Sequence, residues 1–334
     1  MDEIRLGTIG SGVIVHSVLD GVRETDGIRL EAVYSRTEEK AKALAAEYGA
    51  KKTYTDIDAF LTDSSVNFVY IATPNLLHYE QVKRALSAGK NVLCEKPFCT
   101  RADQAEELFA LAEEKGLFLF EAAPTTFLPN YTILKRELPK LGRIRLVMAN
   151  YSQYSSRYDK LLAGEVPNIF NPEYAGGCLM DINFYNVYLN AALFGQPEEA
   201  SYTANLFDFG DGKAVDTSGV VTLRYPDFVS TSVGAKDTWG VNYFQIEGEW
   251  GYLYVKDGSN GIASVRVVTK DSDETYNEQP HPSRWYYEVR KLTEILRAED
   301  RAAFAERRDV TLAAVRIVEA LRKGAGLVFL GDRP

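Results

Sequence analysis

Residues 4–15 have the sequence IRLGTIGSGVIV, which contains the first evidence for the fold. The apolar run at 4–9 predicts a buried strand, Gly10-Ser11-Gly12 predicts a tight turn, and 13–23 predicts a helix. Gly10 permits the turn, and Gly12 lets the backbone approach a pyrophosphate at the helix N-terminus, where Val13 begins. Val15 replaces the third glycine of G-x-G-x-x-G, which should loosen helix–strand packing. Because an ordinary strand–helix turn looks the same, a nucleotide site needs support from other segments.

Strand and helix patterns alternate from this stretch through the first third of the chain. Further strands are expected at 30–34, 66–72, 91–95 and 117–121. Helices are expected between them at 38–48, 78–88 and 102–115. The run at 66–72 lacks polar alternation, as in strands that are covered on both faces. This pattern predicts a doubly wound parallel sheet over residues 1–122, a dinucleotide-binding Rossmann domain.

The pattern changes after residue 122. Longer strands rich in Tyr, Thr, Val and Phe are expected at 143–154, 200–207, 214–224, 228–235, 243–247, 251–255 and 263–269. Helices are expected again only at 284–297 and 310–322. Residues 123–334 are therefore predicted to form a second, α+β domain with a large, mostly antiparallel open sheet.

Composition excludes several classes of protein. The chain has 334 residues, with 38 Lys+Arg against 47 Asp+Glu, so its net charge is −9. An acidic balance argues against nucleic acid or an anionic membrane as the main partner, and favours a small-molecule substrate. The three cysteines have no metal-ligand or disulfide spacing, and no metal is expected. No apolar run approaches a membrane span and no signal peptide precedes the first strand, so a cytoplasmic location is expected.

The end of the second strand distinguishes the two nicotinamide cofactors. An acidic residue there would bind the ribose 2′-hydroxyl of NAD. This chain has Ser35-Arg36 instead, a hydroxyl and a guanidinium that suit a 2′-phosphate. NADP is therefore expected over NAD, although a solvated Arg at a loop start is the alternative.

Two later strands also end in polar residues. Thr73-Pro74-Asn75 follows the central strand, and Glu95-Lys96-Pro97 ends the next one. The carboxyl ends of parallel strands bind ligands, so these residues and His78 are expected to line the cofactor crevice.

The same segments resemble a known family. Residues 73–78 (TPNLLH) and 88–97 (AGKNVLCEKP) are similar to the TPNxxH…AGKHVLCEKP signature of the Gfo/Idh/MocA oxidoreductases, the glucose–fructose oxidoreductase and inositol dehydrogenase family. Residues 175–185 resemble its GGGxxxDxGxY/H segment, and 246–251 its hairpin. The resemblance implies that residues 123–334 bind substrate and form the oligomer interface, in a homodimer or homotetramer.

The resemblance also implies catalytic roles. Lys96 matches a Lys near the nicotinamide and the reacting carbinol, Asp181 matches an acid, and Tyr185 matches the proton-transfer residue. Tyrosine at that position is similar to a subset that includes dihydrodiol and xylose dehydrogenases. A phenol with a pKa of about 10 is a poor base, and a nearby Lys96 ammonium would favour the phenolate. Pro124 and Thr126 replace the Trp and Arg of that subset, which leaves the substrate open.

Residues 151–174 are expected to form a long irregular segment before Asp181. Aromatic, amide and guanidinium groups there suit a sugar or polyol, and an oligomer contact is the equal alternative. The candidate substrate contacts are Tyr154, Arg157, Asn168 and Phe170, together with the earlier Phe127.

The leading hypothesis is an NAD(P)-dependent oxidoreductase that transfers hydride to or from a secondary alcohol or carbonyl of a sugar, polyol or diol. A catalytically silent NAD(P)-sensing protein of the same fold is one alternative, and the presence of both Lys96 and Tyr185 weighs against it. An NAD-dependent glycosidase is another, and Ser35-Arg36 weighs against it because this pair suggests exchangeable NADP.

Overall fold

The computed structural model describes residues 3–210 and 212–332, which form two compact units. The first unit contains the chain up to Pro124 together with Ser283–Leu312. The second contains Thr125–Pro282 and the chain from Ala313 onward. The sequence analysis assigned all of 123–334 to the second domain, whereas residues 283–312 lie in the first unit. Local sequence patterns predict that a helix forms, but not which distant element it packs against.

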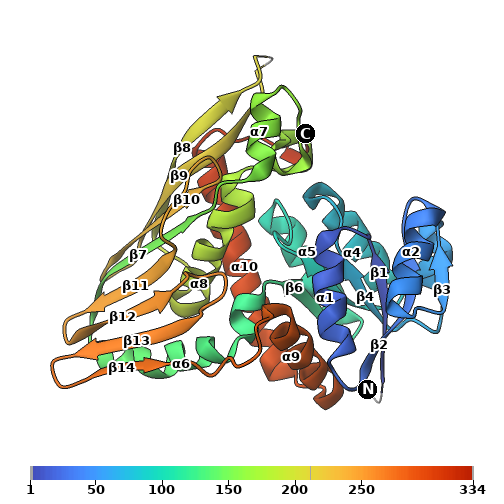
Figure 1. Ribbon diagram of the computed structural model, residues 1–334, viewed down its shortest axis with the longest axis horizontal. Coiled ribbons are helices and arrows are strands. Elements are labelled where there is room, and N and C mark those ends of the chain that lie inside the picture. The colour runs from blue at the N-terminus through green and yellow to red at the C-terminus, as the bar shows by residue number, and fades with distance from the viewer. Residues whose placement is uncertain (1–2, 211, 333–334) are drawn as a thin grey trace. The chain divides into compact units, whose positions relative to one another are not determined.

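The first unit is built on a six-stranded parallel sheet (Figure 1). In sheet order its strands are β3 (Lys52–Tyr54), β2 (Ile28–Tyr34), β1 (Ile4–Ile9), β4 (Phe68–Ile71), β5 (Asn91–Glu95) and β6 (Leu119–Ala122). The strand order reverses between β1 and β4, and ligands bind beyond the carboxyl ends of strands at such a reversal. The predicted doubly wound sheet is confirmed, with its crevice beside the glycine turn.

Helices cover both faces of this sheet. They are α1 (Val13–Arg23), α2 (Glu38–Tyr48), α3 (Ile57–Thr62), α4 (His78–Ser87), α5 (Ala102–Glu114) and α9 (Arg284–Ala298). Right-handed crossovers place α1 and α2 on one face and α4 and α5 on the other. The helix α9 packs closely on α1, because a Cβ at Gly21 would lie 3.0 Å from the carbonyl oxygen of Trp285. β3 and α3 were not predicted, since three residues of an edge strand and a six-residue helix give no clear periodicity.

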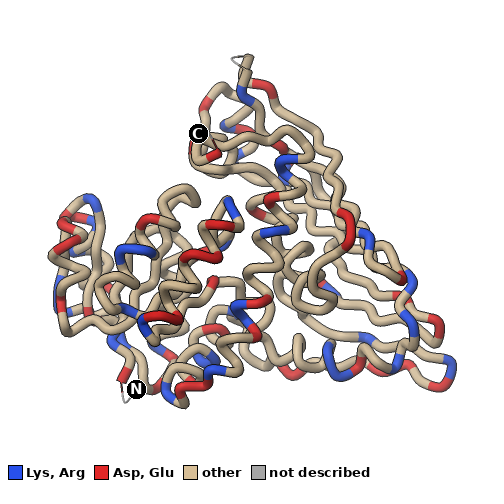
Figure 2. Tube along the Cα trace, turned by 180° about the vertical axis from the view of Figure 1, so that it is seen from behind, with Lys and Arg blue, Asp and Glu red and all other residues tan. Residues whose placement is uncertain are grey.

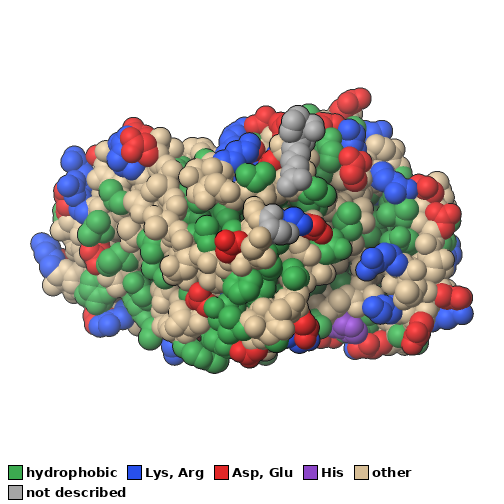
Figure 3. Space-filling view, turned by 90° about the horizontal axis from the view of Figure 1, so that it is seen from above, with side chains coloured by type: hydrophobic (Ala, Val, Ile, Leu, Met, Phe, Trp, Pro, Cys, Tyr) green, Lys and Arg blue, Asp and Glu red, His purple; other side chains and the backbone are tan. Residues whose placement is uncertain are grey.

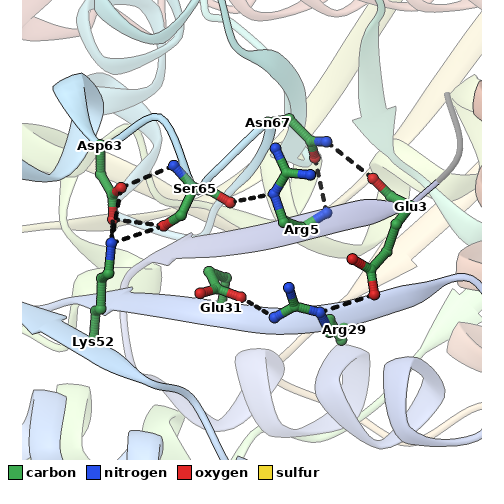
Figure 4. A network of polar contacts seen from close by, with 8 residues as sticks. All are labelled: Glu3, Arg5, Arg29, Glu31, Lys52, Asp63, Ser65 and Asn67. Atoms are coloured by element: carbon green, nitrogen blue, oxygen red, sulfur yellow. Dashed lines mark hydrogen bonds and ion pairs between the residues drawn. The ribbon is translucent and has the colours of Figure 1, made fainter.

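A polar network fixes the amino-terminal edge of this sheet (Figure 4). Lys52 Nζ lies 2.9 and 3.0 Å from the two carboxylate oxygens of Asp63 and 3.0 Å from Ser65 Oγ. Arg5 Nε donates to the carbonyl oxygen of Ser65 at 2.6 Å, and Arg5 N donates to Asn67 Oδ1 at 2.8 Å. Burial alone would raise the pKa of Asp63, but hydrogen bonds from Lys52 and Ser65 outweigh it and hold that pKa well below its usual range. These ion-paired residues therefore stabilise the edge opposite the glycine turn.

The second unit contains an eight-stranded sheet. In sheet order its strands are β14 (Asp273–Tyr276), β13 (Ser264–Thr269), β12 (Gly251–Lys256), β11 (Tyr243–Gly248), β7 (Ile144–Ser152), β10 (Val229–Ala235), β9 (Ala214–Arg224) and β8 (Glu199–Asp208). Only the β7–β10 pair is parallel, so the expected large, mostly antiparallel sheet is confirmed.

One face of this sheet is covered by helices and the other is open. The helices α6 (Pro129–Glu137) and α8 (Phe184–Phe194) lie on one side, and no helix of the described residues lies on the other (Figure 1). Three apolar side chains on neighbouring strands of the open face, Leu146, Val220 and Val233, are exposed. An open, largely uncharged sheet face of this kind is typical of a protein–protein interface.

The structure differs from the sequence analysis in several helices. The segment 151–174, expected to be irregular, contains α7 (Ser156–Leu162) and two short 3₁₀ turns. The last helix, α10 (Arg301–Gly324), begins nine residues before the predicted 310 and belongs to both units. The helix α6 and the strand β14 were not predicted. In each case the missed segment is rich in charged or polar residues, which obscure the apolar period.

Acidic and basic residues are mixed along both units. Figure 2 shows the two signs alternating along the helices and strands, and Figure 3 shows them interspersed with hydrophobic side chains over one face. Neither view shows an extended basic surface of the kind that nucleic acid needs. No helix among the described residues is both long and apolar enough to cross a membrane.

Candidate active site

The glycine turn lies at the reversal of strand order. Gly10 has φ +119°, and a Cβ there would lie 2.4 Å from the carbonyl oxygen of Ala72, so only glycine is accommodated. A Cβ at Gly12 would meet nothing within 4 Å, which leaves the backbone open to a ligand. Ser11 Oγ lies 3.4 Å from Ser35 Oγ, so the turn contacts the end of β2. Two predicted cofactor-binding segments are thereby brought together.

The N-terminus of α1 is available for an anion. Its first turn has no acidic residue and no side-chain cap, and Val13 is 81% exposed. Amide N–H groups without an internal partner attract a pyrophosphate at such a position. Val15, which was expected to loosen the packing, is fully buried, because its side chain points to the sheet and fills the space beside it. The backbone therefore fits a dinucleotide pyrophosphate even without the third glycine.

Ser35 and Arg36 differ in their surroundings. Ser35 is buried and Arg36 is exposed at the start of the loop after β2. Within residues 3–210 and 212–332, the Arg36 guanidinium has neither a hydrogen-bond nor an ion-pair partner. A charged group without an internal partner beside a buried hydroxyl fits a 2′-phosphate.

His78 connects the two later strand ends. It is fully buried at the start of α4, with Nε2 2.9 Å from the carbonyl oxygen of Thr73 and Nδ1 3.1 Å from that of Pro97. Burial lowers the pKa of His78, while the two carbonyl contacts oppose that shift. Thr73 Oγ1 also donates to Gln81 Oε1 at 2.6 Å. The segments 73–75 and 95–97 are thus held together, and His78 itself is a brace rather than an exposed lining group.

Buried carboxyl groups lie next to Lys96 in the chain and in the core. Tyr70 Oη donates to Glu95 Oε1 at 2.5 Å, and Glu95 Oε2 accepts from Lys96 N at 3.3 Å. Burial raises the pKa of Glu95 and of the fully buried Glu288 on α9, and the two charges also disfavour each other. Lys96 itself is partly exposed. The strand end therefore presents the lysine while the acids behind it are shifted toward their neutral form.

In the second unit, Asp181 and Tyr185 lie on one continuous helical segment. A π-helical turn, Leu179–Asn183, contains Asp181 and leads directly into α8, which contains Tyr185. Residues four apart on a helix lie on the same face, as the spacing predicted. The Tyr185 ring is 6% exposed and lies 5.9 Å from the Tyr151 ring, centroid to centroid. A π-turn at this place is a frequent feature of functional sites.

The predicted substrate contacts fall into two groups. Tyr154 is half-buried, and Arg157 and Asn168 are exposed. Phe170 is fully buried in a small core cluster with Leu161 and Val215, and Phe127 is also buried. The exposed polar residues are accessible to a substrate, whereas the two phenylalanines pack in the interior.

The comparisons with known proteins agree with this geometry. Residues 4–122 match the model of an oxidoreductase family with an NAD-binding Rossmann fold, and residues 139–254 match a GFO/IDH/MocA C-terminal domain. The chain is 34% identical to scyllo-inositol 2-dehydrogenase (NADP(+)) IolU of Bacillus subtilis, over 99% of both chains. It belongs to the Gfo/Idh/MocA family of NAD(P)-dependent oxidoreductases.

Other Gfo/Idh/MocA relatives agree. D-xylose 1-dehydrogenase (NADP(+)) 2 of Haloferax volcanii is 32% identical over 81% of this chain and 83% of its own. The structure of KijD10, a 3-ketoreductase from Actinomadura kijaniata in complex with NADP and TDP-benzene, aligns with a TM-score of 0.82 at 25% identity. That alignment covers 96% of this chain and 98% of the other. The expected family, fold and enzyme class are confirmed.

Three residues of this Gfo/Idh/MocA chain next to the predicted site were missed from sequence. Lys236 forms an ion pair with Asp181, and the buried Asp216 accepts hydrogen bonds from Leu179 N at 2.6 Å and Tyr202 Oη at 2.7 Å. Trp239 is 78% exposed and stacks on Tyr154, with ring centroids 5.9 Å apart and planes at 12°. A buried lysine directly after a strand was the available signal for Lys236, but its partner lies 55 residues away.

Proposed function

We propose that the protein is an NADP-dependent dehydrogenase or reductase that interconverts a secondary alcohol and a carbonyl on a sugar, polyol or diol. Asp181 and Tyr185 on one helical face support this chemistry, because they place a phenol beside a carboxylate in a site otherwise lined by aromatic rings. The stacked Tyr154–Trp239 pair supports a ring-shaped substrate, since flat aromatic faces pack against the C–H surface of a sugar or cyclic polyol.

The cofactor-binding residues have separate roles in this proposal. The amides at Gly12 and Val13 bind the pyrophosphate, and Ser35 with Arg36 binds the 2′-phosphate. Thr73, Pro74, Asn75, Glu95 and Pro97 form the crevice walls, which His78 braces. When bound, the nicotinamide accepts or supplies the hydride.

The protein's own groups handle the proton. In oxidation the Tyr185 phenolate accepts the hydroxyl proton of the carbinol while its C–H hydrogen leaves as hydride. In reduction the phenol returns a proton to the carbonyl oxygen. Lys96 provides a positive charge that stabilises oxygen anions in this reaction, and Asp181 orients the reacting groups.

Substitution of Tyr185 and Lys96 tests the mechanism. Tyr185→Phe and Lys96→Ala should each lower kcat by about a hundredfold or more, because each removes a proton-transfer or charge-stabilising group. We expect NADPH affinity, measured by fluorescence, to remain within about twofold for Tyr185→Phe, since it removes one hydroxyl outside the Rossmann unit. The assay uses NADP⁺ with scyllo-inositol, D-xylose and trans-1,2-dihydrobenzene-1,2-diol. Unchanged turnover of an accepted substrate in Tyr185→Phe would refute this role.

A second copy of the chain is the proposed partner. The open face of the eight-stranded sheet has exposed Leu146, Val220 and Val233 on adjacent strands. We infer that two copies pair through this face, as a homodimer or as half of a homotetramer. The three cysteines are buried free thiols, which supports a cytoplasmic location.

A further inference from the structure

Lys236 is a buried cation whose partner is the predicted acid of the site. Its side chain is only 4% exposed, and Nζ forms an ion pair with Asp181 Oδ2. The same Nζ lies 5.6 Å from the centroid of the Phe170 ring, which shields the pair from one side. A lysine in the interior requires such a counter-charge, because an unpaired ammonium would lose its hydration without compensation.

The backbone around Lys236 is fixed on both sides. Lys236 N donates to the carbonyl oxygen of Thr217 at 2.8 Å, and its carbonyl accepts from Ser155 N at 2.9 Å. These bonds extend the pairing of β10 with its two neighbours by one residue, so the side chain has a defined origin. Its ammonium therefore reaches Asp181 from a rigid sheet, which is the best support for a precisely placed charge.

The charge of Asp181 matters to Tyr185. The two residues are four apart on one helical segment, which places their side chains on one face about 5–6 Å apart at Cβ. A lone carboxylate at that distance would disfavour the phenolate that accepts a proton in oxidation. Lys236 cancels this charge while leaving 27% of the Asp181 side chain exposed.

Other titratable groups surround the pair, and none of them replaces Lys236. The only further cation or acid with a direct electrostatic effect on this cluster is carboxylate or neutral in character. These groups are Cys178 on the helical segment, Asp216 on β9, Tyr202 on β8, Asp237 in the loop after β10, and Tyr151 on β7. Asp216 is fully buried and its pKa is raised by burial, which reduces its negative charge.

We propose that Lys236 is a positioning residue for proton transfer: it neutralises and orients Asp181, so that Tyr185 faces a balanced ion pair instead of a lone carboxylate. This inference rests on the proposed role of Tyr185. It assigns the lysine a function through Asp181, with no contact between Lys236 and the substrate.

The test is a double-mutant cycle read by NMR of the cofactor-free protein, with tyrosine labelled at Cζ and the Tyr185 signal assigned from Tyr185→Phe. Lys236→Met should raise the pKa of Tyr185 by about one unit, because Asp181 is left uncompensated. Asp181→Asn should lower it by about as much, and Asp181→Asn combined with Lys236→Met should return it to the wild-type value. Lys236→Arg should retain it. Lys213→Met, which removes an exposed lysine paired with Glu173, is the matched control.

Activity provides a second readout. The pH profile of kcat for oxidation should move to higher pH in Lys236→Met, with kcat lowered about tenfold below the shifted pKa. A loss of melting temperature with an unshifted Tyr185 titration would show a purely structural lysine and overturn the inference. If Lys236→Met does not fold, an unshifted titration in Asp181→Asn would also overturn it. Failure of the proposed function is distinguishable, because it appears as normal turnover in Tyr185→Phe.

Discussion

At the scale of single residues, cofactor choice depends on Arg36. Its guanidinium is exposed and has no hydrogen-bond or ion-pair partner in the described part of the chain. A hydrogen bond between charged groups contributes about 1.5–3 kcal/mol, which corresponds to roughly a 10- to 150-fold change in affinity.

Arg36→Ala should therefore weaken NADPH binding at least tenfold and leave NADH binding within about twofold, as measured by isothermal titration or by thermal shift. Lys40→Ala, a nearby exposed cation on α2, is the matched control. An equal loss for both cofactors would show that Arg36 does not recognise the 2′-phosphate. A wild-type protein stabilised more by NADH than by NADPH would contradict the proposed preference directly.

The residues that sequence could and could not identify differ in one physical respect. Gly10, Gly12 and Ser35 act through backbone conformation or position at a strand end, and both are visible in a short window. Lys236 and Asp216 act through partners that strand pairing brings from distant segments. A local pattern contains no information on register, so these ion pairs and buried acids required the structure.

At the scale of elements, β6, α9 and α10 enclose acids in the first unit. Glu121 on β6 accepts from Phe98 N at 2.9 Å, and Glu288 on α9 is fully buried. Burial raises the pKa of Glu121 to about 8, with hydrogen bonds from Phe98 and Thr311 opposing the shift. A carboxyl pKa raised in the folded state favours the protonated form, so its contribution to stability is full below the unfolded pKa and is lost as pH rises to the folded pKa.

Glu121→Gln should reduce the pH dependence of stability between about pH 4.5 and 8, where a single such group changes the free energy of unfolding by up to about 1.4 kcal/mol per pH unit. We expect the melting temperature of the variant to exceed that of the wild type increasingly toward pH 8. Glu39→Gln, at an exposed position on α2, should leave the slope unchanged. A wild-type slope in Glu121→Gln would contradict a neutral Glu121.

At the scale of the whole molecule, the open sheet face determines assembly. Val220 on β9 and Val233 on β10 are directly opposite each other in register and both are exposed. Lysines at both positions would place two charges in an apolar interface without counter-charges. Val220→Lys combined with Val233→Lys should therefore give a monomer by light scattering. Retention of the wild-type mass, or a monomeric wild type, would exclude this face. Lysines at two exposed positions of α2, Glu38 and Glu39, provide a control.

The order of segments in the first unit has a consequence for protein synthesis. This unit needs both the chain up to Pro124 and Ser283–Leu312, with the whole of the eight-stranded sheet encoded between them. On the ribosome, where domains generally fold as their residues emerge, the face of α1 that packs on α9 stays uncovered until nearly all of the chain has been translated. The nucleotide-binding unit is thus begun first and completed almost last.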